Sequence, residues 1–384
     1  MRTRLGIVGC GYVADSYAAT LQLHTDGLAV HAVYDRQQER LARFSGHWQF
    51  NAARSLDDLL SDPAIDIVVN LTDPHSHETV TAAALTAGKH VYSEKPLAMT
   101  GAVAERLAAR ASAMGLRLAA APCNLLGEHA QTLQRAVRDR LVGDIRLIYA
   151  EMDDGMIHRA AYRDWDSSSG APWPIRGELE VGCTFEHAGY TLGVLVAIFG
   201  PVRSITAFAD LCVPEKGIDP PPEAPAPDFS VGLLQFDGGV TARVTNSIVA
   251  SYDHRIRLFG DEGTLSLAEP WSYHAPVRRD RISTSRFDRL VERRLGKRRS
   301  VVVPHVRRPP TKNRRRFPTM DFMRGVRELA DAIREDRPCR MSPELAVHVT
   351  EVTEVMQHPE RFALPYRPKS AAGPIAPMPW AIEP

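Results

Sequence analysis

The chain has 384 residues, of which 44% are hydrophobic and 24% charged, and its formal net charge is +1. This composition is typical of a soluble globular protein, and no apolar run approaches the ~18 residues that a membrane-spanning helix needs. Because a single hydrophobic core usually stops growing at ~250–300 residues, we expect two domains.

The start of the chain and the cysteines indicate the compartment. Strand-like sequence begins by Leu5, which leaves no room for a secretory or twin-arginine signal. The five cysteines are scattered and show neither a CxxC pair nor metal-ligand spacing. We therefore expect a cytoplasmic protein with free thiols, no membrane partner and no metal site.

A glycine-rich motif follows the first apolar run, residues 5–8, and reads Gly9-Cys10-Gly11-Tyr12-Val13-Ala14. In a G-x-G-x-x-A motif the first glycine permits a sharp turn and the second lets a pyrophosphate approach the backbone. The small last residue lets the next helix pack on the strand. The phosphates then lie at the helix N-terminus, where N–H groups and the helix dipole favour anions. The motif predicts dinucleotide binding, and the alternative is a plain strand–turn–helix.

A second apolar run, Leu28 to Tyr34, ends in an acid. Asp35 lies 21 residues past Ala14, near the ~20 expected for the carboxylate that binds the adenosine ribose. Its charge repels a 2′-phosphate, so we expect NAD as the cofactor. Arg36 keeps NADP as the alternative, because a guanidinium binds that phosphate or stacks on adenine.

Strand-like and helix-like runs alternate up to residue 122, as in a doubly wound parallel sheet. Two polar motifs, Thr72–His77 and Glu94-Lys95-Pro96, follow strands at their carboxyl ends, where α/β sheets bind ligands. Pro96 makes the turn after Lys95 rigid. An ammonium there can hydrogen-bond a substrate hydroxyl and favour its alkoxide-like transition state.

The second half contains strand-like runs without intervening helices, at residues 146–151, 204–209, 231–236, 240–249 and 255–259. In 240–248 the apolar residues alternate, as in a half-buried strand. We therefore expect an α/β protein with a Rossmann dinucleotide-binding domain, 1–122. An α+β substrate and oligomerisation domain, 123–384, follows it with a large sheet. Closing helices near 320–357 are expected to pack back on the first domain.

Two segments have unusual composition. Residues 214–227 contain six prolines and predict a surface loop, with a substrate lid as the alternative. Residues 278–316 hold 16 Lys/Arg and three acids, a local charge of +13. Such a segment can bind an anionic partner, a carrier-linked substrate or nucleic acid. We favour a solvated insertion and expect no nucleic-acid partner, because few aromatics interleave with the basic residues.

Several motifs occur in the order typical of one known family. They are G-x-G-x-x-A at the start, T-x-P-x-x-H at Thr72–His77, Glu94-Lys95-Pro96, and a turn at Gly260–Leu265. With these motifs the chain resembles the Gfo/Idh/MocA oxidoreductases over about residues 4–360. The resemblance implies that the second domain carries a mainly antiparallel sheet, whose outer face joins subunits into a homodimer or homotetramer.

The resemblance also implies roles for single residues. Lys95 matches a catalytic lysine, and Glu94 matches a glutamate beside the nicotinamide. His77 matches a strand-end histidine that shapes the cofactor pocket. Asn124 matches a position near substrate and nicotinamide.

A second group of polar residues opens an apolar helix that ends at Gly200. The family pattern D-x-G-x-H-x-x-D falls here on Glu186, Ala188, Tyr190 and Gly193, and only Glu186 keeps its chemical type. Glu186 and Tyr190 lie four apart on one helix face and so point at the same ligand. Some family members carry tyrosine where most have histidine, which implies that Tyr190 is the acid/base and that Lys95 is its assisting cation. The alternatives are a core aromatic at Tyr190 and His187 as the acid/base, although His187 turns ~100° away from that face.

The candidate residues form three groups. The catalytic candidates are Lys95, Tyr190 and Glu186, with Glu186 orienting the substrate or its partner. The cofactor candidates are Gly9, Gly11, Tyr12, Val13, Ala14, Asp35, Arg36, Leu71, Thr72, His77, Glu94, Lys95, Pro96 and Asn124. The substrate candidates are Lys95, Asn124, Trp165, Trp173, Glu186, His187 and Tyr190, the tryptophans by stacking on a sugar face or else serving only in loop packing.

These observations predict an NAD(P)-dependent oxidoreductase that moves hydride between nicotinamide and a secondary carbinol of a sugar, polyol or sugar conjugate. One alternative is an NADPH-dependent reductase of a C=N or C=C bond in secondary metabolism. The other is a non-catalytic dinucleotide sensor or scaffold. The substrate and the physiological direction do not follow from the sequence.

Overall fold

The computed structural model describes residues 2–282, 285–286, 290, 293–294, 300–307 and 319–382. The first domain is a five-stranded parallel sheet in the order β2-β1-β3-β4-β5. Its strands are β1 (Thr3–Val8), β2 (Leu28–Tyr34), β3 (Ile67–Asn70), β4 (His90–Ser93) and β5 (Leu118–Ala120). β1 and β2 coincide with the predicted apolar runs 5–8 and 28–34 to within about two residues, and the parallel order confirms the doubly wound sheet.

Helices of the first domain begin and end at the residues that local chemistry favours. They are α1 (Tyr12–Leu21), α2 (Gln38–Trp48), α3 (Leu56–Ser61), α4 (His77–Thr86) and α5 (Gly101–Ala113). The hydroxyl of Ser55 caps α3 by accepting from the Asp58 N–H at 3.0 Å, and Thr100 caps α5 in the same way. Gly88, with a φ of +77°, follows α4 and permits the left-handed turn there.

The second domain contains an eight-stranded sheet in the order β13-β12-β11-β10-β6-β9-β8-β7. All neighbouring pairs are antiparallel except β6 with β9, as expected for a mainly antiparallel sheet. Its strands are β6 (Ile145–Asp153), β7 (Val202–Asp210), β8 (Phe229–Phe236), β9 (Thr241–Ser247), β10 (Ile256–Gly260), β11 (Gly263–Leu267), β12 (Val277–Arg281) and β13 (Ser300–Val303).

Strand β13 and all of β12 except Val277 lie in the basic segment 278–316, which we predicted to be a solvated insertion. They extend the sheet at one edge, where charged side chains are common because one side of the strand meets solvent. Most of the remaining basic segment lies outside the described residues, including 308–316.

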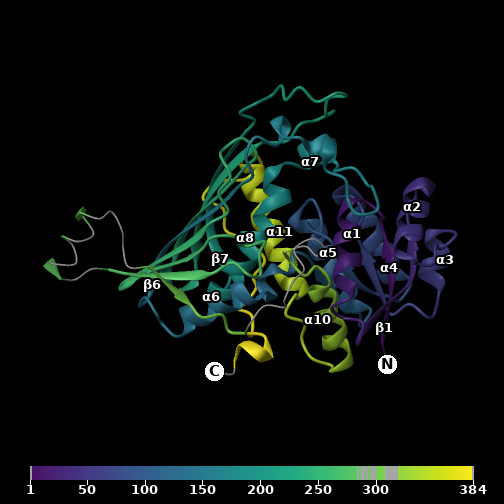
Figure 1. The fold of residues 1–384 in the computed structure, drawn as a ribbon, viewed down its shortest axis with the longest axis horizontal. Coiled ribbons are helices and arrows are strands. Elements are labelled where there is room, and N and C mark those ends of the chain that lie inside the picture. The colour runs from purple at the N-terminus through teal and green to yellow at the C-terminus, as the bar shows by residue number, and fades with distance from the viewer. Residues whose placement is uncertain are drawn as a thin grey trace.

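Among the described residues of the second domain, the longer helices are α6 (Glu128–Arg138), α7 (Ile175–Val181), α8 (Cys183–Phe199), α10 (Met323–Arg334) and α11 (Pro343–Gln357). Every residue of α8 from Cys183 to Ala197 is buried, and the helix contacts both the large sheet and α11 (Figure 1). Within the described residues, no single helix has the length and apolarity to cross a membrane. Helices α7 and α8 together are long and apolar enough, but they meet at a bend of 75°.

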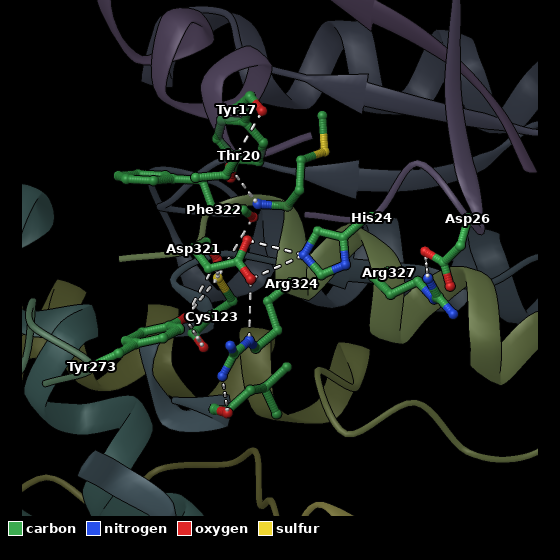
Figure 2. A network of polar contacts seen from close by, with 12 residues as sticks. Tyr17, Thr20, His24, Asp26, Cys123, Tyr273, Asp321, Phe322, Arg324 and Arg327 are labelled. Carbon is green, nitrogen blue, oxygen red and sulfur yellow. Dashed lines mark hydrogen bonds and ion pairs between the residues drawn. The ribbon is translucent and has the colours of Figure 1, made fainter. Parts of the chain in front are cut away.

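The closing helices pack on the first domain. α11 lies against α5, where the Gly101 N–H donates to Glu354 at 2.7 Å. α10 lies against α1, where the Met323 N–H donates to the Thr20 hydroxyl at 3.1 Å. Figure 2 shows this second contact as part of a polar network around Asp321 and Arg324. We propose the domain boundary at residues 122–123, directly after β5.

Candidate active site

The turn after β1 is shaped to receive a dinucleotide. Gly9 has a φ of +99°, and a Cβ there would lie 2.5 Å from the Leu71 backbone, so the position requires glycine. A Cβ at Gly11 would meet only open space, so the backbone at the start of α1 can be approached closely. Gly11 is the N-cap of α1 and offers no side chain to occupy the first N–H groups. These features fit a pyrophosphate.

Asp35 and Arg36 lie at the carboxyl end of β2, beside this turn. Asp35 is buried, and its carboxylate accepts from the Cys10 N–H at 2.8 Å and the Gln37 N–H at 2.7 Å. The Arg36 guanidinium is largely exposed and lies 3.7 Å from the Asp73 carboxylate. Arg40, which sequence reasoning missed, lines the same cavity.

One cavity of about 1160 Å³ joins the dinucleotide turn to α8. Most of the predicted residues line it: Gly9, Gly11, Tyr12, Val13, Asp35, Arg36, Leu71, Thr72, Glu94, Lys95, Trp165, Trp173, Glu186, His187 and Tyr190. The structure therefore brings the cofactor candidates and the substrate candidates of both domains into one space.

Lys95 forms an ion pair with Glu186 across the domain boundary. Burial disfavours the ammonium, but the neighbouring Glu186 carboxylate raises its pKa above the usual value. Beside it, Glu94 accepts from the Tyr17 hydroxyl at 2.6 Å and the Lys95 N–H at 2.9 Å. The lysine is therefore held as a cation at the carboxyl end of β4.

Tyr190 lies one helical turn past Glu186, and its ring packs edge-on against Trp271 with centroids 5.2 Å apart. Burial raises the pKa of its phenol above the usual value, and the opposing effect of Lys95 is smaller. Lys95 therefore lowers the pKa of this phenol, but by less than burial raises it. Tyr190 keeps its proton.

Glu178, on α7, is an acid of the cavity that sequence reasoning missed. Burial and the adjacent Glu186 carboxylate raise its pKa well above the usual value, and the two side chains share a hydrogen bond. Two carboxyl groups in contact favour one shared proton. Burial and the Glu186 carboxylate thus favour the protonated form of Glu178 next to the Lys95–Glu186 pair.

His187 follows Glu186 directly on α8. It lines the same cavity as Glu186, because the second domain surrounds the start of α8. Its Nε2 lies 3.0 Å from the Asp154 carboxylate. Asp154 also contacts His254 at 2.8 Å, and His254 lies 3.3 Å from Glu269. Burial opposes a charge on His254, but its bonds to Asp154 and Glu269 raise its pKa to about 9.

Four of the candidate residues, Ala14, His77, Pro96 and Asn124, do not line this cavity. Ala14 is fully buried where α1 packs on the sheet. The His77 ring lies between the carbonyl oxygens of Pro96 and Thr72, at 2.6 and 3.0 Å, so it acts on the pocket only through those loops. Pro96 lies outside the lining of this cavity. Asn124 is buried and donates to the carbonyls of Tyr190 and Pro270.

Some of the aromatic residues that line the cavity were predicted and others were not. Trp165 and Trp173 pack edge-on with centroids 5.1 Å apart, and both line the cavity. Trp271 and Tyr252 also line it and were not predicted, because they lie in loops without a local motif. The Pro-rich segment 214–227 contributes no lining residue and packs near α7, where the Ala226 N–H donates to the Leu179 carbonyl.

The first domain carries a dinucleotide-binding turn at the end of a parallel strand. The cavity at this turn also contains the Lys95–Glu186 ion pair and is walled by the second, α+β domain. This arrangement is that of an NAD(P)-dependent oxidoreductase. The chain belongs to the GFO/IDH/MocA family. The sequence model described as "Oxidoreductase family, NAD-binding Rossmann fold" matches residues 3–121, and the GFO/IDH/MocA C-terminal domain matches residues 130–266.

Named relatives agree with this assignment. Trans-1,2-dihydrobenzene-1,2-diol dehydrogenase of Mus musculus is 26% identical over 71% of this chain and 76% of its own. Inositol 2-dehydrogenase 1 of Saccharopolyspora erythraea is 28% identical over 70% of this chain and 75% of its own. The structure of aldose-aldose oxidoreductase from Caulobacter crescentus shares the fold, with a TM-score of 0.72, 19% identity and coverage of 94% and 98% of the two chains.

Proposed function

We propose that the protein catalyses hydride transfer between a nicotinamide cofactor and a secondary carbinol of a sugar, polyol or sugar conjugate. The observation that carries the proposal is the Lys95–Glu186 pair with Tyr190 in the cavity that begins at the dinucleotide turn. The bound cofactor supplies or accepts the hydride. The residues of this chain bind and orient the substrate and move the proton.

Lys95 donates a hydrogen bond to the reacting oxygen and stabilises the negative charge that develops there. Glu186 positions the ammonium and keeps it charged. Tyr190 exchanges the proton of the oxygen, and since its phenol keeps its proton, it suits the direction in which a carbonyl is reduced. In that direction the carbon gains hydride and the oxygen gains the tyrosine proton.

The walls of the cavity support a polyhydroxylated substrate. Trp165, Trp173 and Trp271 offer apolar ring surfaces, and Asp154 offers carboxylate oxygens that accept hydroxyl hydrogen bonds. The relatives named for a dihydrodiol and for inositol are dehydrogenases of ring-borne hydroxyls. Both observations favour a secondary carbinol over a C=N or C=C bond.

The experiment is a fluorescence titration with NADH and NADPH, followed by a turnover screen of polyols, sugars and the matching ketones. We expect saturable binding of NADH and turnover with at least one class of carbinol or ketone. Binding of either cofactor without turnover across the whole panel would contradict the proposal and favour the sensor or scaffold alternative. Turnover of only C=N or C=C substrates would favour the reductase alternative.

A further inference from the structure

A loop of the second domain reaches the dinucleotide helix of the first. It spans residues 165–173, precedes α7 and extends toward α1 (Figure 1). The Ser169 N–H donates to Asp15 Oδ1 at 3.2 Å, and the Ser169 hydroxyl donates to Asp15 Oδ2 at 2.8 Å. The Ser167 hydroxyl donates to the same Oδ2. Two serines of one domain thus bind one carboxylate of the other.

Asp15 follows directly on the G-x-G-x-x-A motif, in the first turn of α1. It is only 3% exposed, and the Trp48 indole also donates to it, at 2.6 Å. A buried carboxylate needs several donors to remain charged, and here they come from the loop and from α2. The side chain therefore binds the loop and is not available to a ligand.

The loop is closed on itself and presents its other residues to the cavity. The Ser167 N–H donates to the Ala171 carbonyl at 2.8 Å, and the Ala171 N–H donates back to the Ser167 hydroxyl at 3.0 Å. Trp165, Ala171, Pro172 and Trp173 line the same cavity as Gly11 and Tyr12. A ligand that lies along the turn after β1 is therefore flanked by this loop.

We propose that Asp15 is a positioning residue that clasps loop 165–173 over the bound dinucleotide, and that opening of this clasp limits cofactor release. The inference rests on dinucleotide binding by the first domain and extends it to the kinetics of exchange. Asp15 does not touch the reacting atoms. It acts through the loop that carries Trp165 and Trp173.

The test is stopped-flow fluorescence of the full chain loaded with NADH and chased with excess NAD⁺. Asp15→Ala removes the clasp entirely, whereas the double variant Ser167→Ala/Ser169→Ala removes its two hydroxyl bonds and keeps the Ser169 N–H bond to Asp15. We expect the NADH dissociation rate to rise about tenfold or more in Asp15→Ala and by a smaller factor in the serine variant. Ser168→Ala is the matched control, because Ser168 is exposed in the same loop and should release NADH at the wild-type rate.

The serine variant keeps the Asp15–Trp48 hydrogen bond. It therefore tests the effect of the clasp on NADH release even if Asp15→Ala folds poorly. Wild-type dissociation rates in the serine variant would overturn the proposal. Dissociation is measured without substrate, so failure of the proposed reaction appears separately, as missing turnover in a chain that still binds NADH. A wild-type chain without NADH binding would overturn the clasp together with the cofactor assignment.

Discussion

At the scale of single residues, Lys95 is the group on which the proposed chemistry depends. Methionine matches the lysine stem in length but cannot donate a hydrogen bond, so Lys95→Met removes the charge that stabilises the reacting oxygen. We expect kcat to fall about 10²–10³-fold, while NADH titration still saturates. The exposed Lys369→Met is the matched control. Normal turnover in Lys95→Met would reject the carbinol mechanism and support the C=N or C=C alternative.

Glu178 allows a test by pH. Its pKa is raised in the folded chain by burial and by Glu186, so the folded state holds a proton that the unfolded state loses above the ordinary glutamate pKa of ~4.3. The stability contribution of this group therefore falls as pH rises from that value toward the folded pKa. Glu178→Gln keeps the neutral shape and removes this dependence.

We expect Glu178→Gln to have a higher Tm than the wild type at pH 8, with the difference shrinking toward pH 4.5. Thermal unfolding at several pH values measures this. A Tm difference that stays constant with pH would show that Glu178 is already ionised in the folded chain.

At the scale of elements, the strands of the first domain follow directly from the sequence, because each is a short apolar run bounded by turn residues. The apolar runs 5–8 and 28–34 predicted β1 and β2. β12 and β13, the last two strands at one side of the large sheet, were not predicted. Their arginines and valines do not alternate in the way that indicates a strand. α6 was not predicted because it carries many polar residues despite a buried face.

Some residues of the candidate site could also be predicted from the sequence, and others could not. Lys95 and Glu186 belong to local motifs, so a resemblance identifies them. Asp154, Glu178 and His254 come from three separate segments of the second domain that meet only through the large sheet and α7. Their proximity depends on tertiary structure, and nothing in their immediate sequence indicates it.

We expect the end of β2 to set the preference between NADH and NADPH. The Asp35 carboxylate is buried beside the dinucleotide turn, whereas the Arg36 side chain is mostly in solvent. We expect NADH to bind at least about tenfold more tightly than NADPH, because the carboxylate repels a 2′-phosphate. Asp35→Ser should narrow this ratio, and Arg36→Ala should leave NADH binding almost unchanged. Parallel titrations measure both, and tighter NADPH binding by the wild type would reverse the assignment.

At the scale of the whole molecule, the exposed face of the large sheet is the proposed oligomer interface. Phe208 on β7 and Leu233 on β8 are 56% and 52% exposed, and they are diagonal neighbours on one face of the sheet. We expect a homodimer or homotetramer that Phe208→Glu/Leu233→Glu converts to monomers, measured by light scattering after size exclusion. Ile382→Glu, 60% exposed in the tail, is the control. A wild-type monomer would reject this interface.

The network in Figure 2 links the second domain to α1 of the first. Arg324 is 5% exposed and lies between two buried carboxylates, with Glu128 at 2.8 Å and Asp321 at 3.3 Å. The Asp321 carboxylate also contacts the first domain, where the Nε2 of His24 lies 2.9 Å from Asp321 Oδ2. The residues next to it, Met320 and Phe322, line the cavity. This cluster therefore sets how the start of α10 lies against the site.

Arg324→Met removes the buried cation that Glu128 and Asp321 share, and leaves Glu128 with Arg307 and Asp321 with His24 as partners. We expect the free energy of unfolding to fall by about 3–5 kcal/mol. Arg327→Met is the control on the same helix, since Arg327 pairs with Asp26, which is 71% exposed, and with Asp331 one turn along the helix, and such pairs contribute at most about 1 kcal/mol each. Urea unfolding measures both. Equal losses in the two variants would mean that the domains are held by apolar packing between α10 and α1, with the Arg324 cluster contributing no more than a surface pair.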